Sequence, residues 1–321
     1  MEYKFCGKSG LQLPKISLGL WHNFGFLADF NEARKMIRYA FDQGVTHIDI
    51  ANNYGPPPGS AESVFGKILK EDFSNHRDEM IISSKAGYLM WNGPYGNGGS
   101  RKYLISSLNQ SLKRTGLEYF DIFYSHRYDP DTPIEETMQA LVDIARQGKA
   151  LYVGISNYPA DKEKIAMRYL KEQNVPCLIY QGRYSMFNRK PEEEILAIAN
   201  DFGSGFIAYS PLAQGVLTDK YLNGIPKNSR AGESHGFLRT EQVRPELIEK
   251  VKVLNEIAVK RGQTMAEMAL AWALRDERVT SLIVGSRTVG QLKDNLKALD
   301  NLSFTADELA TIDGILDGAT L

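Results

Sequence analysis

The sequence contains little cysteine and nothing that resembles an export signal. Its 321 residues include two cysteines, Cys6 and Cys177. They form no C-x-x-C pair, and no cysteine–histidine cluster has the spacing of a zinc site. The first residues contain no apolar signal core, and no apolar run is long enough to span a bilayer. We therefore expect a cytoplasmic protein with reduced thiols, no bound metal and no membrane partner.

An excess of charge of one sign is also missing. The 38 lysines and arginines against 39 aspartates and glutamates leave a formal net charge of -1. Bulk charge therefore gives no reason to expect nucleic acid as a partner. Two phosphate-binding motifs are absent as well, because no G-x-G-x-x-G follows the first expected strand and no Walker A pattern occurs. These absences argue against a doubly wound dinucleotide-binding sheet, which the pattern of elements alone would leave open.

Eight short apolar runs alternate with longer segments of helical periodicity. Each run is rich in β-branched or aromatic residues, which is typical of strands covered on both faces. Strands that alternate with helices indicate a parallel sheet with right-handed crossovers, and eight such units close into a barrel. We expect an α/β fold, a (β/α)₈ TIM barrel formed by residues 1–321 as a single domain. The expected strands are residues 15–21, 46–51, 80–85, 120–125, 150–156, 177–181, 206–210 and 280–285.

Several helices have recognisable ends. Ser100 is expected to begin a helix that ends before Gly116. Thr132-Pro-Ile-Glu135 has the pattern of a capping box, for a helix that ends at Gly148. Residues 3–14 predict a hairpin before the first barrel strand. Further helices are expected at residues 31–43, 61–69, 160–172, 191–201, 246–261, 265–275, 289–299 and 306–316.

Four ionisable side chains follow or end neighbouring strands. Asp49 and then Tyr54 come at the end of the second strand, Lys85 ends the third, and His126 follows the fourth. In a barrel the active site forms at this end of the strands. Taken singly, each residue has an ordinary interpretation: a capping aspartate, a solvated lysine, a structural tyrosine or histidine. Together at one barrel mouth, they predict a catalytic site.

Their chemistry fits reduction of a carbonyl group. The oxygen of a carbonyl that receives hydride needs a proton. A phenol is a weak acid, with a pKa of about 10, but a nearby ammonium lowers that pKa. We expect Lys85 to do this for Tyr54, and Asp49 to keep Lys85 charged and in place. His126 is expected to orient the carbonyl oxygen or share the proton.

The chain resembles the aldo-keto reductase family over essentially its whole length. Three motifs resemble that family's tetrad of aspartate, tyrosine, lysine and histidine, and three others resemble its cofactor motifs. The tetrad motifs are Asp49-Ile-Ala-Asn-Asn-Tyr54-Gly55, Ile82-Ser-Ser-Lys85 and Asp121-Ile-Phe-Tyr-Ser-His126. The cofactor motifs are Gly154-Ile-Ser-Asn157, Tyr209-Ser-Pro-Leu-Ala213 and residues 285–295.

A second set of motifs is similar to a narrower branch of this family. The branch contains bacterial L-glyceraldehyde 3-phosphate reductases and the β subunits of voltage-gated potassium channels. The motifs are Cys6-Gly-Lys-Ser-Gly10, Gly19-Leu-Trp-His-Asn-Phe-Gly25, Asn53-Tyr-Gly-Pro-Pro-Pro-Gly59, Ser100-Arg-Lys-Tyr103, and Gly224-Ile-Pro226 leading to Ser229-Arg230.

The resemblance implies NADPH (NADP) as the cofactor and Tyr54 as the general acid. Ser156, Asn157 and Gln181 would hold the nicotinamide carboxamide, and Tyr209 would stack on the nicotinamide ring. Arginine suits the 2′-phosphate because its guanidinium donates two hydrogen bonds. The cofactor-binding residues expected from the resemblance are Trp21, Asp49, Ser156, Asn157, Gln181, Tyr209, Ser210, Leu212, Gln214, Lys220, Arg230, Gly285, Arg287, Gln291 and Asn295.

The substrate side is expected to take a small aldehyde or ketone, such as L-glyceraldehyde 3-phosphate or methylglyoxal. An apolar wall is expected from Trp21, Phe24, Tyr88, Met90 and Trp91, with ordinary loop packing as the alternative. Arg101 and Arg127 could attract a substrate anion or form surface ion pairs. The histidines other than His126, which are His22, His47, His76 and His235, are expected to be structural or solvated.

An alternative function is a nucleotide-binding regulator like the channel β subunits. Those subunits lack a histidine at the fourth tetrad position, so His126 favours the enzyme. A metal-dependent sugar isomerase on the same barrel would need a His/Glu/Asp ligand set that we do not find in the sequence, and the fold alone does not decide function. The resemblance to channel subunits also implies a homo-oligomer, a tetramer or larger.

Overall fold

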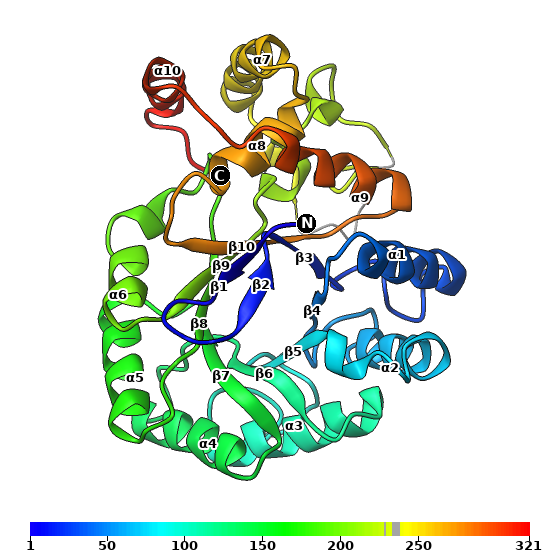
Figure 1. Ribbon diagram of the computed structural model, residues 1–321, viewed down its shortest axis with the longest axis vertical. Coiled ribbons are helices and arrows are strands. Elements are labelled where there is room, and N and C mark those ends of the chain that lie inside the picture. Colours follow the sequence, from blue (N-terminus) through cyan, green and yellow to red (C-terminus); the bar gives the residue numbers. More distant parts are fainter. Residues whose placement is uncertain (228, 233–237) are drawn as a thin grey trace.

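The computed structural model describes residues 1–227, 229–232 and 238–321, so the expectation for His235 lies outside the described residues. Within these ranges eight parallel strands close into a barrel in the order β10-β3-β4-β5-β6-β7-β8-β9 (Figure 1). This confirms the expected (β/α)₈ TIM barrel. The barrel strands are β3 (Ile16–Gly19), β4 (His47–Asp49), β5 (Ile81–Ala86), β6 (Phe120–Ser125), β7 (Ala150–Ser156), β8 (Ile179–Arg183), β9 (Gly205–Tyr209) and β10 (Val279–Val284).

Helices surround the barrel and cover its strands, whose residues are buried almost throughout (Figure 1). None of the described helices combines the length and the apolarity needed to cross a membrane. The α-helices are α1 (Phe30–Asp42), α2 (Ser60–Asp72), α3 (Arg101–Thr115), α4 (Ile134–Arg146), α5 (Ala160–Glu172), α6 (Ile195–Asp201), α7 (Pro245–Lys260), α8 (Met265–Ala273), α9 (Val289–Leu296) and α10 (Ala306–Leu316). Short 3₁₀ helices are η1 (Arg77–Glu79), η2 (Lys190–Glu192), η3 (Ala213–Gly215), η4 (Asp219–Tyr221), η5 (Thr240–Gln242) and η6 (Lys297–Asp300).

Two helix starts show how local hydrogen bonds decide the boundaries. Ser100 caps α3 as expected, since its hydroxyl accepts a hydrogen bond from the Tyr103 backbone N–H at 3.2 Å. The capping box expected at Thr132 is wrong. Helix α4 begins after Pro133, and the Thr132 hydroxyl donates instead to the Asp129 carboxylate at 2.8 Å. Pro133 takes the N-cap position of α4 instead of Thr132, and its side chain has no oxygen that could accept a hydrogen bond from the first N–H groups.

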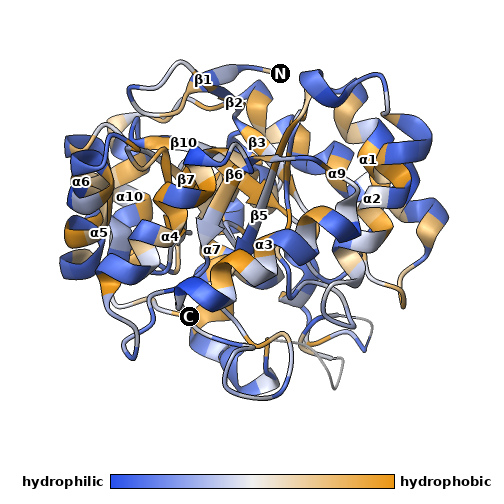
Figure 2. Cartoon of the chain, turned by 90° about the horizontal axis from the view of Figure 1, so that it is seen from below, coloured by the Kyte–Doolittle hydropathy of each residue, from blue (hydrophilic) through white to orange (hydrophobic). Residues whose placement is uncertain are grey.

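The predicted N-terminal hairpin lies over one end of the barrel. It pairs β1 (Tyr3–Phe5) with β2 (Gln12–Pro14) antiparallel and sits at the top edge of the molecule in Figure 2. The Lys8 N–H donates to the Gly203 carbonyl at 2.8 Å, just before β9 begins. Gly7 has φ +58°, and a side chain there would come within 2.1 Å of that carbonyl oxygen. The hairpin therefore covers the end where strands begin and leaves the other end open.

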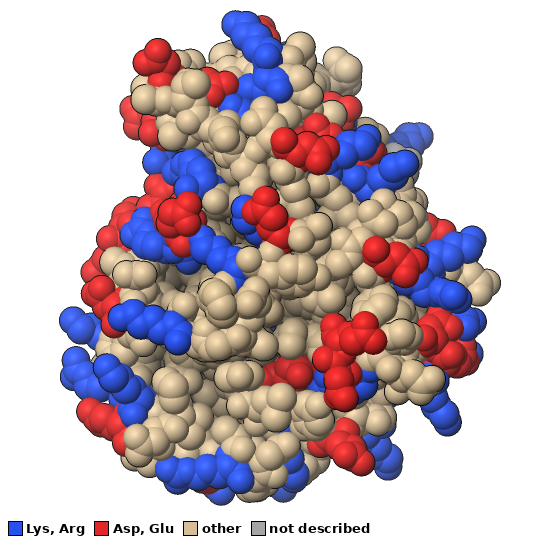
Figure 3. All heavy atoms as spheres, viewed as in Figure 1, with Lys and Arg blue, Asp and Glu red and all other residues tan. Residues whose placement is uncertain are grey.

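The face seen with the hairpin in front carries lysine, arginine, aspartate and glutamate interspersed (Figure 3). No large field of one sign dominates this face, in keeping with the near-zero formal charge.

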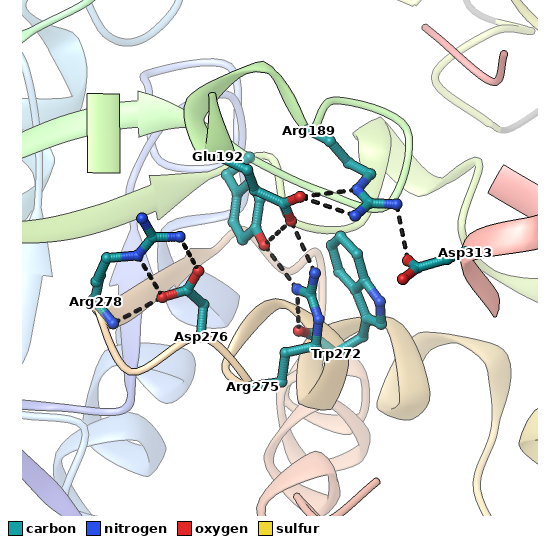
Figure 4. A network of polar contacts seen from close by, with 8 residues as sticks. Arg189, Glu192, Trp272, Arg275, Asp276, Arg278 and Asp313 are labelled. Atoms are coloured by element: carbon teal, nitrogen blue, oxygen red, sulfur yellow. Dashed lines mark hydrogen bonds and ion pairs between the residues drawn. The ribbon is translucent and has the colours of Figure 1, made fainter. Parts of the chain in front are cut away.

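A polar network ties the last helix to the barrel (Figure 4). Arg189 donates to the carboxylates of Asp313 on α10 and Glu192 on η2, at 2.8 and 3.0 Å. Glu192 also accepts from Arg275 at 2.8 Å. The Arg275 guanidinium lies 3.6 Å from the ring centroid of the fully buried Trp272, which adds a cation–π contact. These contacts fasten three segments that are distant in sequence.

A buried carboxyl group on α5 has no such partners. Glu163 is fully buried, and neither of its carboxyl oxygens has a hydrogen-bond partner among the described residues. Burial raises the pKa of Glu163 to about 9. The folded protein therefore holds this carboxyl in its neutral form at neutral pH.

We predict that Glu163→Gln stabilises the protein in mildly alkaline solution. The pKa of Glu163 is raised on folding, so between about pH 4.5 and pH 9 the unfolded chain releases a proton that the folded chain keeps. Stability from this group is therefore full below the unfolded pKa and is lost as the pH rises. At pH 8 the variant should exceed the wild type in free energy of unfolding by about 1–3 kcal/mol. Urea denaturation at pH 5 and pH 8 measures this, and an identical pH dependence of both proteins would contradict it.

Candidate active site

The four predicted catalytic residues lie together at the open end of the barrel. Asp49 is the last residue of β4, Tyr54 lies in the loop beyond it, Lys85 is the residue before the end of β5, and His126 directly follows β6. The Lys85 Nζ lies 2.6 Å from Asp49 Oδ2 and 5.0 Å from the ring centroid of Tyr54. The ring centroids of Tyr54 and His126 are 5.9 Å apart. The convergence follows because the strands are parallel and end at the same edge.

The Lys85–Asp49 pair is buried. The Lys85 side chain is 0% exposed and that of Asp49 is 2% exposed. Lys85 also donates to the Ile50 carbonyl at 2.8 Å, while Asp49 Oδ1 accepts from the Ser83 hydroxyl at 2.8 Å and from the Gln181 amide at 3.0 Å. Burial lowers the pKa of Lys85, and the charge of Asp49 opposes this change. The carboxylate thus favours the charged form of the lysine, as expected from the sequence.

The pKa of Tyr54 differs from what we expect from the sequence. Burial first, and the charge of Asp49 second, raise the pKa of Tyr54 well above its usual value. The net direction of this pKa is therefore opposite to the lowering that we expect from Lys85. Burial is the largest cause because it disfavours the charged phenolate, and the negative charge of Asp49 acts in the same direction. Tyr54 is accordingly protonated at neutral pH.

His126 is a neutral imidazole at neutral pH. Burial lowers its pKa well below the usual value, and the positive charges of Lys85 and Arg127 lower it further. Its Nδ1 atom is buried and has no hydrogen-bond partner in the part of the chain that the structure describes. The ring of Tyr88 lies edge-on at 4.7 Å between centroids. A neutral imidazole beside a protonated phenol can donate a hydrogen bond to an oxygen without supplying a charge.

A cavity of about 940 Å³ opens at these residues. Its volume is near the upper end for small-molecule and cofactor pockets. Two predicted residues, Lys85 and Ser156, are fully buried behind its wall. The predicted residues that line the cavity are Trp21, Asp49, Tyr54, His126, Asn157, Gln181, Tyr209, Ser210, Leu212, Gln214, Lys220, Arg230, Gly285, Arg287, Gln291 and Asn295.

The turns after β7 and β9 hold unusual backbone angles. Asn157 has φ +56°, Ser210 +53°, Ala213 +47° and Gln214 +58°. Such left-handed conformations are uncommon for residues other than glycine and gather where function requires them. The Tyr209 hydroxyl donates to Asn157 Oδ1 at 2.8 Å, and this bond fixes the aromatic ring at the cavity wall.

The residues around the cavity suit a dinucleotide. Asn157 Nδ2 donates to His126 O at 3.1 Å, which connects the aromatic wall to the catalytic cluster. Gln214 Oε1 is buried without a partner among the described residues, although the side chain lines the cavity. At the start of α9, the Arg287 N–H donates to Gln291 Oε1 at 2.8 Å. A buried acceptor without a donor and a helix start with an arginine are both features that a nucleotide can satisfy.

The residues expected to form an apolar wall on the substrate side divide between the two interpretations, cavity wall and loop packing. Trp21 and Tyr88 line the cavity, whereas Phe24, Met90 and Trp91 pack against the hydrophobic core instead. The sequence pattern of a loop cannot show whether an apolar side chain lines a cavity or packs against the core. His22, expected to be structural or solvated, also lines the cavity.

The two arginines considered for substrate binding have structural partners. Arg101 forms an ion pair with Asp143. Arg127 donates to the Gly87 carbonyl at 2.9 Å and to Asn97 Oδ1 at 3.2 Å, and these bonds hold the loop after β5. For Arg101 the ion-pair interpretation is therefore confirmed.

Helices far along the chain add residues that sequence reasoning missed. Asn255 on α7, Gln263 in the following turn and Glu267 on α8 all line the cavity. Helix α8 begins with a capping box in which Thr264 and Glu267 bond each other's backbone, so Glu267 also has a structural role. From the sequence we look for functional residues at the ends of strands, and none of these three residues lies at a strand end.

Comparison with known proteins identifies the relatives of the chain. The family model described as "Aldo/keto reductase family" matches residues 15–317. L-glyceraldehyde 3-phosphate reductase of Escherichia coli (strain K12) is 54% identical over 323 residues, covering 99% of this chain and 93% of the relative. A probable voltage-gated potassium channel subunit beta of Arabidopsis thaliana is 37% identical over 306 residues, covering 94% of this chain and 92% of the relative.

We predict that Asp49→Asn destabilises the protein by leaving a buried ammonium without its counter-ion. Removing one partner of a buried pair should lower the free energy of unfolding by about 3 kcal/mol. Adding Lys85→Met removes the second charge as well, so most of this loss should be recovered. Urea denaturation of the two variants at pH 7 provides the measurement. A double variant no more stable than Asp49→Asn would show that the pair is not held as a buried unit.

Proposed function

Because this chain belongs to the aldo/keto reductase family, we propose that it uses NADPH to reduce small aldehydes or ketones to alcohols. The observation that supports this most directly is the cluster at the barrel mouth. A protonated phenol, a buried ammonium–carboxylate pair and a neutral imidazole lie at one cavity. Carbonyl reduction needs such a proton donor beside the reacting oxygen.

The residues divide the proton chemistry between them. A bound dihydronicotinamide would supply the hydride. Tyr54 holds the proton that the carbonyl oxygen takes up, because its raised pKa keeps the phenol protonated until the oxygen gains negative charge. The phenolate left behind faces the Lys85 ammonium, 5.0 Å from the ring centroid, which stabilises it. His126 orients the same oxygen through a neutral imidazole N–H.

The cofactor would occupy the cavity that opens at the four catalytic residues. Ser156, Asn157 and Gln181 would hold the carboxamide, and Tyr209 would lie along the nicotinamide ring. Ser210, Leu212, Gln214 and Lys220 would surround the pyrophosphate. The adenosine and its 2′-phosphate would lie against Arg230, Gly285, Arg287, Gln291 and Asn295, with Trp21 near the reacting end. All of these residues except the buried Ser156 line the same cavity, and this supports the assignment.

The proposed substrate is a short aldehyde, with L-glyceraldehyde 3-phosphate first and methylglyoxal second. The first follows from the name of the relative that is 54% identical over 99% of this chain. A nucleotide-binding regulator is the competing function, suggested by relatives described as channel subunits. Assembly into a tetramer or larger ring and location in the cytoplasm stay predictions.

We predict that Tyr54→Phe abolishes turnover and spares cofactor binding. The substitution removes only the hydroxyl, so kcat should fall by about 10²- to 10⁴-fold while the Kd for NADPH changes little. NADPH oxidation over a panel of phosphorylated and unphosphorylated short aldehydes gives kcat, and fluorescence titration gives the Kd. Wild-type turnover in the variant would remove the proton donor from the proposal. Tight NADPH binding by the wild type without turnover on any aldehyde would favour the regulator.

We also predict that NADPH binds at least about tenfold more tightly than NADH. The 2′-phosphate can form charge-assisted, bidentate hydrogen bonds with an arginine, which a ribose hydroxyl cannot. Arg287→Leu should therefore weaken NADPH binding and leave NADH binding nearly unchanged. Titration of both cofactors against both proteins measures the difference. Equal dissociation constants for the two cofactors in the wild type would contradict the assignment of the phosphate site.

A further inference from the structure

A chain of buried hydrogen bonds crosses the barrel interior from the hairpin end to the catalytic carboxylate. Its five links are 2.6, 2.7, 2.9, 3.1 and 2.8 Å long. Every side chain in it is buried. In order, the links join the Pro14 carbonyl, the Ser281 hydroxyl, the Ser17 hydroxyl, Nδ1 and Nε2 of His47, the Ser83 hydroxyl and Asp49 Oδ1.

The alternation of the strands explains why these side chains meet. His47 and Asp49 are two residues apart on β4, and Ser83 and Lys85 are two residues apart on β5. Residues at this spacing point to the same face of a strand. Asp49 pairs with Ser83 across the two strands. The imidazole therefore lies one position deeper in the barrel than the catalytic pair.

This chain of hydrogen bonds has one proton fewer than it has links. Both ends, the Pro14 carbonyl and the Asp49 carboxylate, only accept hydrogen bonds. The three serine hydroxyls supply three protons, and a neutral His47 supplies one. Four protons cannot fill five links, so one link has no proton between its atoms. The position of the proton on His47 decides which link that is.

The neutral form of His47 follows from its surroundings. Burial lowers the pKa of His47 to about 4, although the charge of Asp49 opposes this and that of Lys85 reinforces it. These are the charged groups that act on the ring, from β4 and β5. The hydroxyls of Ser17 on β3 and Ser83 on β5 are its direct partners. At neutral pH the count of four protons therefore holds.

The negative charge of Asp49 decides which nitrogen of His47 carries the proton. If Nδ1 carried the hydrogen, Ser83 would have to choose between His47 Nε2 and the Asp49 carboxylate. Only the Nε2–H form leaves Asp49 as the sole acceptor within the chain for the Ser83 hydrogen, and it also points the imidazole N–H along the chain toward the negative charge of Asp49. If Nε2 carries it, the gap moves to the links of Ser17, where both neighbours are neutral. The Ser83 hydroxyl has a further contact with the Ile48 carbonyl, but at 3.5 Å it is too long to compete.

We propose that His47 is a positioning residue that carries its proton on Nε2, donates it to Ser83 and thereby commits the Ser83 proton to Asp49. Asp49 Oδ1 is then held by Ser83 and Gln181, and Oδ2 stays directed at Lys85. A carboxylate that could rotate would distribute its hydrogen bonds among Ser83, Gln181 and Lys85 in more than one way. The orientation of the ammonium beside Tyr54 therefore depends on an imidazole that touches neither substrate nor cofactor. For its effect on turnover, this inference rests on the proposed reductase function.

The experiment compares two amide variants that differ in reach. The Gln side chain in His47→Gln places its amide nitrogen near the position of Nε2, whereas the Asn in His47→Asn ends near Nδ1. We expect His47→Gln to keep kcat within about threefold, and His47→Asn to lower kcat about tenfold with little change in the KM for aldehyde or NADPH. Ser17→Ala is the matched control on the other side of the ring, and its kcat should stay within about twofold of the wild type.

A double-mutant cycle separates positioning from a general loss of packing. If His47 acts through Ser83, the variant Ser83→Ala should lose as much kcat alone as together with His47→Asn. Losses that multiply, or a Ser17→Ala variant as impaired as His47→Asn, would overturn the proposal. Thermal unfolding of each variant identifies those that are simply less folded.

A readout without turnover keeps the inference separate from the proposed function. Nitrogen-15 NMR of the histidine rings reports which nitrogen carries the proton. The signals of His47 are identified as those missing from the spectrum of His47→Gln. We expect the Nε2–H tautomer at pH 7, and an Nδ1–H tautomer or a doubly protonated ring would overturn the proposal. If the wild type reduced no aldehyde, the reductase function would fail while this spectrum still decided the state of His47.

Discussion

The bond between Lys85 and Asp49 is the interaction on which the rest of the site depends. An ammonium that is 0% exposed persists only because a carboxylate lies 2.6 Å away and further groups hold that carboxylate. The cost of burying both charges is offset by hydrogen bonds from Ser83 on the neighbouring β5 and from Gln181 on β8, which is not adjacent to β4 in the barrel. A closed barrel can supply such partners because its interior is lined from every side. The tetrad is therefore a property of the barrel and not of one loop.

The two ends of the barrel separate stability from chemistry. At one end the hairpin covers the strand starts, with Gly7 packed against the chain before β9. At the other end the turns after β7 and β9 keep left-handed residues, such as Asn157 and Gln214, beside a large cavity. Backbone strain at the open end is tolerated because the closed end and the surrounding helices supply the buried apolar area. This division is what allows polar groups to remain partly unsatisfied where a ligand binds.

The sequence predicted the barrel and the position of the tetrad, but not the state of the groups. Apolar runs and strand-end residues such as Asp49 and Lys85 follow from local pattern and parallel topology. The pKa of Tyr54 does not, because it depends first on how deeply the phenol is buried and then on the charge of Asp49. The capping box at Thr132 failed because α4 begins one residue later, with Pro133 at the N-cap position. His47 carried a signal, since His-x-Asp and Ser-x-Lys alternate toward one face, but its direct partners Ser17 and Ser83 come from two other strands.

Three buried polar groups show how this fold settles unpaired atoms in different ways. Glu163 lies away from the cavity and stays neutral, with its pKa raised to about 9. His126 Nδ1 and Gln214 Oε1 also lack partners among the described residues, but both side chains line the cavity. A carboxyl can remove its own charge by holding a proton, whereas an amide oxygen cannot change its state. An unpaired amide at a cavity wall therefore indicates a missing ligand more strongly than an unpaired carboxyl in the core. By this criterion Gln214 indicates a polar ligand in the cavity on grounds that are independent of the tetrad and of the family.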